Sequence, residues 1–134
     1  MRFDRFTAKL QQALSDAQSI AVGRDHSSIE TIHLLLALLQ QKDGSVSPLL
    51  KQAGANLATL DKKLSEQLER VATLKNPTGE VQVGQDLQRV FNLTDKLAQQ
   101  RQDQFIASEL VLLAIMDAGG DTAKSLQQSG VDQA

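Results

Sequence analysis

The sequence has no cysteine, tryptophan or tyrosine, and only two prolines and four phenylalanines among its 134 residues. Without cysteine the chain can form no disulfide, thiolate nucleophile or cysteine metal site, which fits a reducing compartment, so we expect a cytoplasmic protein. The N-terminus has no continuous hydrophobic segment, and the longest apolar run, Leu34 to Leu39, is too short to cross a bilayer. We therefore expect neither a signal peptide nor a membrane span.

Neither sign of charge is in large excess, since the chain has 14 basic and 16 acidic residues and no block of Lys and Arg. Few aromatics and no basic patch argue against nucleic acid as a partner. The chain has no phosphate-loop motif and no nucleophile elbow, so we expect this domain to bind no ATP and to catalyse nothing. His26 and His33 are the only histidines, and without a carboxylate cluster they predict neither a metal nor a cofactor site.

The hydrophobic content of 41% is typical of a globular chain, and we expect residues 1–134 to form one domain. Apolar residues at three- and four-residue spacing predict a first helix with Asp4 as its N-cap and Gly23 as its stop. Ser27 and Glu30 have the spacing of a capping box and predict the start of a second helix, which closes at 42–44. The first stripe consists of Phe3, Phe6, Leu10, Leu14, Ala17 and Ala21.

Two further helices are predicted in the first half. Ser47 followed by Pro48 predicts the start of a short helix that ends at Gly54. Asn56 can cap a fourth helix, whose apolar face is opposed by lysines and glutamates. That apolar face is formed by Leu57, Leu60, Leu64, Leu68 and Val71.

The pattern breaks over residues 75–84, where proline and glycines predict a linker and where Val81 and Val83 alone are too little for a strand. Helical spacing resumes near Leu87 and continues to about residue 102. After a turn, a densely apolar helix follows in Phe105 to Met116, which Gly119-Gly120 ends. Thr122 then predicts the cap of a short helix that stops at Gly130.

The second half repeats the first. The segment IETIHLLLALL, Ile29 to Leu39, aligns with the helix of Phe105 to Met116 at an offset of 77, whereas Ala17 pairs with Asp95 at an offset of 78. A helix that is apolar on most of its faces has to be surrounded by others, so we expect each of these two helices to be central in its unit. We therefore predict an all-α, pseudo-twofold domain of two tandem four-helix units, because such units must pack together to bury their faces. The units cover residues 1–74 and 85–134, with the last helix truncated at the end of the chain.

Comparison of the two copies also helps to distinguish structural from functional residues, because a residue required by the fold should tend to occur in both. Glu109 aligns with Ile32, so the fold needs no carboxylate there, although the helix dipole also favours one. Asp103 pairs with Asp25 and can equally be a turn residue. The Thr7 hydroxyl, on the buried side of its stripe, can bond the backbone or a nearby carboxylate.

Two positions are more apolar in the second copy. Leu93 replaces Ser15, and Leu110 replaces His33. Leu93 lies outside the main stripe of its helix and can form a surface groove beside Phe91. Packing between the two repeats explains these side chains equally well.

Three segments, MRFDRFTAKLQQALSDAQ, IETIHLLLALLQQKDGSVSPLLKQAG and QDLQRVFNLTDKLAQQRQDQFIASEL, resemble the N-terminal domains of the ClpB chaperones. The resemblance covers essentially the whole chain, and the doubled unit is similar to Clp N-domains in general. It implies a mobile domain attached to the two ATPase modules of a disaggregase. In that family Thr7, Asp103 and Glu109 are implicated in chaperone activity, and an apolar groove, here carried onto Phe91, Leu93 and Leu110, holds substrate.

We accordingly expect a monomeric module that binds exposed apolar segments of unfolded or aggregated polypeptides and passes them to its own AAA+ ring, with ATP bound elsewhere in the parent protein. Asp103 and Glu109 would favour segments with nearby Lys or Arg. An adaptor-docking domain of a protease-linked ClpA or ClpC type is the alternative. The sequence departs from the family in its linker, KNPTGEVQVG, which has fewer glycines, and in the missing last helix.

Overall fold

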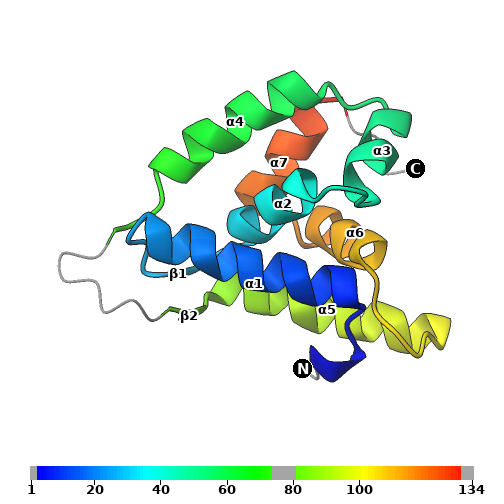
Figure 1. Ribbon diagram of the computed structural model, residues 1–134. Coiled ribbons are helices and arrows are strands. Elements are labelled where there is room, and N and C mark those ends of the chain that lie inside the picture. Colours follow the sequence, from blue (N-terminus) through cyan, green and yellow to red (C-terminus); the bar gives the residue numbers. More distant parts are fainter. Residues whose placement is uncertain (1–2, 74–80, 131–134) are drawn as a thin grey trace.

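The computed structural model describes residues 3–73 and 81–130, and helices dominate both parts (Figure 1). None of the described helices is long and apolar enough to cross a membrane. The all-α prediction is confirmed. The helices are α1 (Ala8–Gly23), α2 (Thr31–Gln40), α3 (Val46–Gln52), α4 (Leu57–Glu69), α5 (Gln85–Arg101), α6 (Ser108–Ala118) and α7 (Gly120–Gln128), together with a 3-10 turn, η1 (Phe3–Arg5), and the strands β1 (Ser28–Ile29) and β2 (Gln82–Val83).

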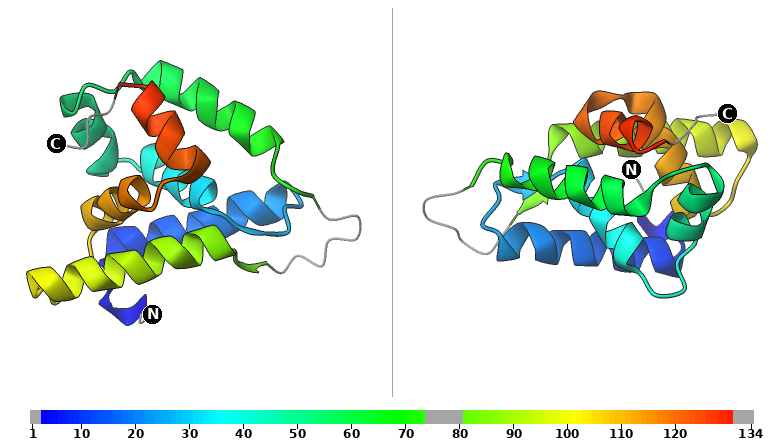
Figure 2. Two further views of the ribbon diagram at one scale, coloured as in Figure 1. Left: turned by 180° about the vertical axis from the view of Figure 1, so that it is seen from behind. Right: turned by 90° about the horizontal axis from the view of Figure 1, so that it is seen from above.

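The helices α2 and α6 lie in the middle of the molecule. Figure 1 and its reverse view in Figure 2 place α1 and α5 on one side of them and α3, α4 and α7 on the other. Both central helices bury most of their residues, including Leu34, Leu35, Val111 and Ala114, each with an exposed fraction of 0%. A helix that is apolar on most faces must be covered by its neighbours, so the prediction that these two helices are central is confirmed.

The burial pattern fixes the register between the two repeats. The side chains buried on α1 recur on α5 at one constant offset of 77, so that Ala17 corresponds to Thr94 and not to Asp95. Backbone conformation agrees, because Asp25 and Gln102 both have left-handed φ angles, of 58° and 60°. The predicted pairing of Asp25 with Asp103 is therefore wrong by one residue. The predicted pairing matched two aspartates, whereas the burial pattern and the φ angles pair Asp25 with Gln102.

Several predicted helix starts are displaced. The N-cap of α1 is Thr7 and not Asp4, because η1 occupies residues 3–5. The N-cap of α2 is Glu30 and not Ser27, since residues 28–29 are extended in β1. The end of α1 is also shifted, because Gly23 is its last helical residue and Asp25 takes the left-handed turn.

Of the helices α3, α4 and α7, α4 alone begins where it was predicted to begin. Helix α3 begins at Val46 after Ser45, so Pro48 is its third residue, where an amide hydrogen would have no helical partner. Asn56 caps α4 as predicted, and its side chain accepts from the Thr59 amide at 3.1 Å. Helix α7 begins at Gly120, directly after α6, so Thr122 is a buried residue inside it and not its cap.

The segment that was predicted to be too short for a strand does pair. In the part of the chain that the structure describes, β1 and β2 form a two-stranded parallel pair with Ser28 opposite Gln82 and Ile29 opposite Val83. The second repeat has the matching contact, a bridge between Phe6 and Ile106. Residues 75–80 of the predicted linker and residues 131–134, where the truncated helix would begin, lie outside the described residues, and the division into two repeat segments stays a prediction.

The two repeats also meet at equivalent glycines. Gly54 and Gly130 follow α3 and α7, and both have left-handed φ angles, of 96° and 103°. A Cβ atom at Gly130 would lie 2.8 Å from the Gly54 carbonyl oxygen. Next to them the Asn56 amide donates to the Ser129 carbonyl at 2.8 Å. A Cβ at Gly54 would lie 3.2 Å from the Gly130 carbonyl oxygen, so the backbones approach closely here and Gly130 in particular has no room for a side chain.

Candidate binding corner

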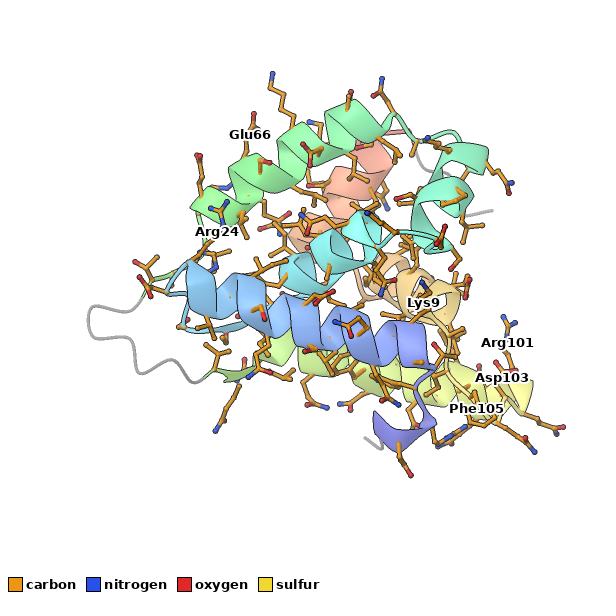
Figure 3. The ribbon with its side chains drawn as sticks, viewed as in Figure 1. Lys9, Arg24, Glu66, Arg101, Asp103 and Phe105 are labelled. Carbon is orange, nitrogen blue, oxygen red and sulfur yellow. The ribbon has the colours of Figure 1, made fainter. Side chains whose placement is uncertain are left out.

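The candidate site is the corner where α5 turns into α6 beside the start of α1. We define the α5–α6 corner as residues 101–110 together with Arg5 and Thr7. Figure 3 shows Arg101, Asp103 and Phe105 close together at this end of the molecule, with their side chains on its surface. Three of the predicted site residues lie in the turn and the first turn of α6, and Thr7 lies at the start of α1.

Arg5 fixes the backbone of this corner. Its Nη2 donates to the Asp103 carbonyl at 2.6 Å and its Nε to the Gln104 carbonyl at 3.4 Å. Its Nη1 also lies 3.5 Å from a carboxylate oxygen of Asp95 on α5. The Ile106 amide donates to the Arg5 carbonyl at 2.8 Å, so residues on both sides of Phe105 are held by η1.

Thr7 links the same corner to α1. Its amide donates to the Ile106 carbonyl at 2.9 Å. Its hydroxyl oxygen accepts from the Leu10 amide at 3.3 Å and so caps α1. The structure thus selects the backbone from the two partners predicted for this hydroxyl. A residue with these contacts positions α1 against the α5–α6 corner.

The two predicted carboxylates differ in their surroundings. Asp103 lies 3.2 Å from Arg101 Nε, and the two side chains are 36% and 60% exposed. An exposed pair of this kind contributes little stability, but it offsets the charge of Asp103. Glu109 is exposed in the first turn of α6 and forms no ion pair with any residue in the two described segments. Glu109 therefore presents the less compensated negative charge.

Two of the three residues assigned to the apolar groove are core residues. Phe91 has an exposed fraction of 0%, and its ring packs on Phe6 with the centroids 5.5 Å apart. Leu110 is 7% exposed. The prediction that Phe91 lines a surface groove is wrong, because the ring is fully buried against Phe6. Leu110 reaches the surface only at its edge.

Leu93 is the residue of this set that remains partly on the surface. It is half-buried on α5, as is Leu97 four residues later, and Leu113 is half-buried on α6, which packs against α5. In the corrected register the counterpart of Leu93 is Asp16. We call Leu93, Leu97 and Leu113 the leucine strip. Because the first repeat has a carboxylate at the position of Leu93, the fold does not require a leucine there.

Sequence reasoning missed Phe105, which it assigned to the core helix. Phe105 is 64% exposed, compared with 38% for Leu49, the other exposed large hydrophobic residue among those whose side chains the structure describes. Ile106 pairs with Phe6 and points inward, so its neighbour Phe105 points outward. The counterpart of Phe105 is Ser28. That polar residue was the available signal that this position faces solvent.

In the first repeat, the equivalent corner is a network of buried hydrogen bonds. The counterparts of Asp103, Phe105, Ala107 and Leu110 are His26, Ser28, Glu30 and His33. His26 and His33 lie within hydrogen-bond distance of each other, and the Ser28 hydroxyl donates to the Glu30 carboxylate. Phe105, Ala107 and Leu110 have no polar side-chain atom, so the second repeat cannot form this network.

The perturbed pKa values also belong to the first-repeat corner. A hydrogen bond with Asp86, followed by burial, raises the pKa of Glu30 to about 7. Burial, and then the neighbouring His26, lowers the pKa of His33 to about 4. In the described segments no three His, Asp or Glu side chains are arranged to hold a metal ion. The α5–α6 corner itself therefore offers surface contacts and charge.

Comparison with known proteins gives a consistent result. The model of the Clp repeat N-terminal domain matches residues 5–129. The chaperone protein ClpB of Pseudomonas putida is 53% identical over 133 residues, which are 99% of this chain and 16% of that protein. ClpB of Vibrio cholerae is 44% identical over 133 residues, again 99% and 16%. The chain thus spans about a sixth of the length of these curated relatives.

Solved structures share the fold. The N-terminal domain of Hsp104 from Candida albicans has a TM-score of 0.83 at 19% identity, covering 96% of this chain and 83% of that one. A complex of the ClpV N-domain with a VipB peptide has a TM-score of 0.78 at 19% identity, covering 98% and 81%. At such identities the likeness shows the fold alone.

Proposed function

The chain belongs to the family of Clp repeat N-terminal domains and is similar to the N-terminal part of ClpB chaperones, and from this premise we propose that it binds exposed apolar segments of unfolded or aggregated polypeptides. In a parent protein of the ClpB type it would deliver these segments to an AAA+ ring that binds and hydrolyses ATP. The observation that carries the proposal is Leu93, a half-buried leucine where the first repeat has Asp16.

The leucine strip and Phe105 supply the apolar contacts. The strip offers the sides of three leucines on α5 and α6, and Phe105 offers most of a phenyl ring. Aromatic side chains that stand on a fixed backbone contribute strongly to protein binding, because little conformational entropy is lost on docking. Arg5 and Thr7 provide that fixed backbone here.

Charge adds selectivity. Glu109 leaves a negative charge in the first turn of α6, and Asp103 adds a partly compensated one. An apolar segment with Lys or Arg beside it would meet these carboxylates with favourable electrostatics. Segments flanked by Asp or Glu would be disfavoured at the same surface.

Binding at this surface should be weak. Three half-buried leucines and one phenyl ring bury a small area, and an unfolded partner loses conformational entropy when it docks. Several copies of the domain around one ring would compensate through avidity. We therefore propose that the isolated domain is monomeric and that tight capture belongs to the assembled parent.

Two comparisons support peptide binding as opposed to other roles. A neighbour of the same fold, the ClpV N-domain, is known in complex with a VipB peptide. The curated relatives of high identity carry the name ClpB, which favours a disaggregase over the adaptor-docking domain of a protease-linked unfoldase.

The proposal is tested by amide chemical-shift mapping of the domain with a leucine- and phenylalanine-rich peptide. We expect the amides of residues 93–97, 103–106 and 109–113 to shift, and those of α4 to stay unchanged. A second peptide with the same apolar segment but Gln in place of its flanking Lys residues should bind more weakly. No shifts at saturating peptide would refute binding, and equal affinities would refute the charge selectivity alone.

A further inference from the structure

The buried pair of His26 and His33 lies outside the proposed binding surface and has a distinct chemistry. The exposed fractions of the two residues are 3% and 0%, and His26 Nδ1 lies 2.8 Å from His33 Nε2. The rings are 5.0 Å apart between centroids and tilted by 45°. A contact this short between two ring nitrogens requires that one of them carries the hydrogen and the other accepts it.

A third contact fixes which nitrogen carries the hydrogen. The Glu30 amide lies 2.8 Å from His33 Nδ1, and a backbone amide can only donate. His33 Nδ1 is therefore an acceptor, and the hydrogen of neutral His33 is on Nε2. That Nε2–H donates to His26 Nδ1, which places the hydrogen of neutral His26 on its own Nε2. Both rings are thereby set in one tautomer.

This arrangement leaves no nitrogen that can take a proton without a loss. The two basic positions, His26 Nδ1 and His33 Nδ1, each already accept a hydrogen bond. A proton on His26 Nδ1 would face the Nε2–H of His33, and a proton on His33 Nδ1 would face the Glu30 amide hydrogen. Either proton therefore breaks one of the two bonds and leaves a charge in a buried site.

The pair supports a contact between distant parts of the chain. His26 forms an isolated antiparallel bridge with Thr73, just after α4, and the adjacent Ser27 amide donates to the Ala72 carbonyl at 3.2 Å. The buried His26 side chain thus anchors residues 26–27, the segment that pairs with residues 72–73. In the second repeat the matching residues, Asp103 and Leu110, contain no imidazole.

We propose that the His26–His33 pair is an acid-sensitive latch, which holds residues 72–73 against the α1–α2 connection while both rings are neutral and releases them when either ring is protonated. The latch would change how the end of α4 is attached without involving the α5–α6 corner. It is therefore independent of the proposed peptide binding.

The surrounding charges are compatible with this response. Exposed Arg24, labelled in Figure 3, opposes protonation of His26, whereas its neighbour Asp25 favours it less strongly. Glu30, the N-cap of α2, and Asp86 on α5 share a hydrogen bond, and Arg70 just after α4 lines the same hollow as Ser27. The pKa of His26 is lowered, first by burial, and that of His33 is lowered to about 4. The latch should therefore be lost as the pH falls from 6.5, the ordinary pKa of histidine, towards about 4.

The test is hydrogen exchange by NMR at pH 7.5, 6 and 5, expressed as protection factors so that intrinsic exchange rates cancel. For His33 alone, a shift from 6.5 to about 4 multiplies the open population by roughly 30 at pH 5, so the protection of the Ser27 amide should fall by about that factor. The Asp103 amide is the internal control, because it occupies the position of the His26 amide in the second repeat.

The imidazole nitrogen shifts give a readout that needs no variant. At pH 7.5 both rings should show the Nε2–H tautomer, and protection of Ser27 should decline with their protonation. Removing both titrating rings in His26→Asn/His33→Asn, which retains an oxygen acceptor at each position, should abolish the fall of Ser27 protection on acidification. A Ser27 protection factor that is constant from pH 7.5 to 5, or an equal fall at Asp103, would overturn the proposal, as would an Nδ1–H tautomer at His33.

Discussion

Gly54 and Gly130 face each other across the contact between the repeats, and a Cβ added at Gly130 would lie 2.8 Å from the Gly54 carbonyl oxygen. Gly130 also has a φ of 103°, which side chains rarely adopt. We expect Gly130→Ala to lower the free energy of unfolding by at least about 1 kcal/mol. Gly23→Ala is the control, since its Cβ would meet nothing within 4 Å and it ends a helix. Urea denaturation of both variants decides the point; equal stabilities would contradict the close approach.

Leu93→Asp introduces the residue that the first repeat has at this position. We expect it to weaken binding of an apolar peptide by roughly tenfold, which corresponds to about 1.4 kcal/mol, because a carboxylate interrupts the leucine strip. Folding should change little, since Asp16 is tolerated at the equivalent site. Leu49→Asp is the matched control, a 38% exposed leucine on α3 and far from the strip in sequence. If both variants bind alike, the strip is not the binding surface.

Phe105→Ala should reduce peptide affinity several-fold and leave the free energy of unfolding within about 0.5 kcal/mol of the wild type, because its ring is 64% exposed. Phe91→Ala should lower the free energy of unfolding by about 3 to 5 kcal/mol, because that ring is fully buried. Fluorescence anisotropy with a labelled peptide and thermal unfolding give the two quantities. A loss of stability in Phe105→Ala comparable to that in Phe91→Ala would place both rings in the core.

Thr7→Ala removes the cap of α1 and should cost about 1 kcal/mol of stability. Thr7→Ser keeps the accepting oxygen and should retain both stability and peptide binding. If Thr7 acts by positioning the α5–α6 corner, the alanine variant will bind more weakly and the serine variant normally. Weak binding by the serine variant at full stability would instead indicate a direct contact with the peptide.

Glu30 makes stability depend on pH. Its pKa of about 7 in the folded domain lies above the ordinary value of 4.5, so the protonated carboxyl stabilises the fold. This contribution is fully present below about pH 4.5, falls as the pH rises through about 7, and is constant above that. Glu30→Gln keeps a group that can hydrogen-bond Asp86 and should remove this dependence. The difference between wild type and variant, measured by urea unfolding from pH 4.5 to 8, isolates the carboxyl from the histidines; a flat difference would exclude it.

Helix content and the central position of α2 and α6 could be predicted from the sequence, because apolar spacing and dense apolar runs reflect burial directly. The helix starts could not be placed as well. Thr7 and Glu30 became caps because η1 and β1 fold the chain just before them, and those contacts join distant segments. The register failed for a similar reason, since a shared aspartate stood one residue away from the position that the fold makes equivalent.

The candidate site was predicted in part. Comparison of the repeats identified Leu93 and Glu109 as positions where the copies differ, and the structure leaves both accessible. The repeats also contained a signal that distinguishes Phe91 from Phe105, since their counterparts are Leu14 and the polar Ser28. The pairing of Phe6 with Ile106 agrees with it, because it leaves Phe105 pointing outward.

The three contacts of Arg5 give the first residues of the chain a role disproportionate to their length. Together with the burial of Phe6 against Phe91, these contacts hold the turn that carries Phe105. A chain beginning at Ala8 would lose Phe6 from the core, the Thr7 cap of α1 and the Arg5 contacts that hold the α5–α6 corner. Residues 5–7 therefore couple the packing of the core to the shape of the α5–α6 corner.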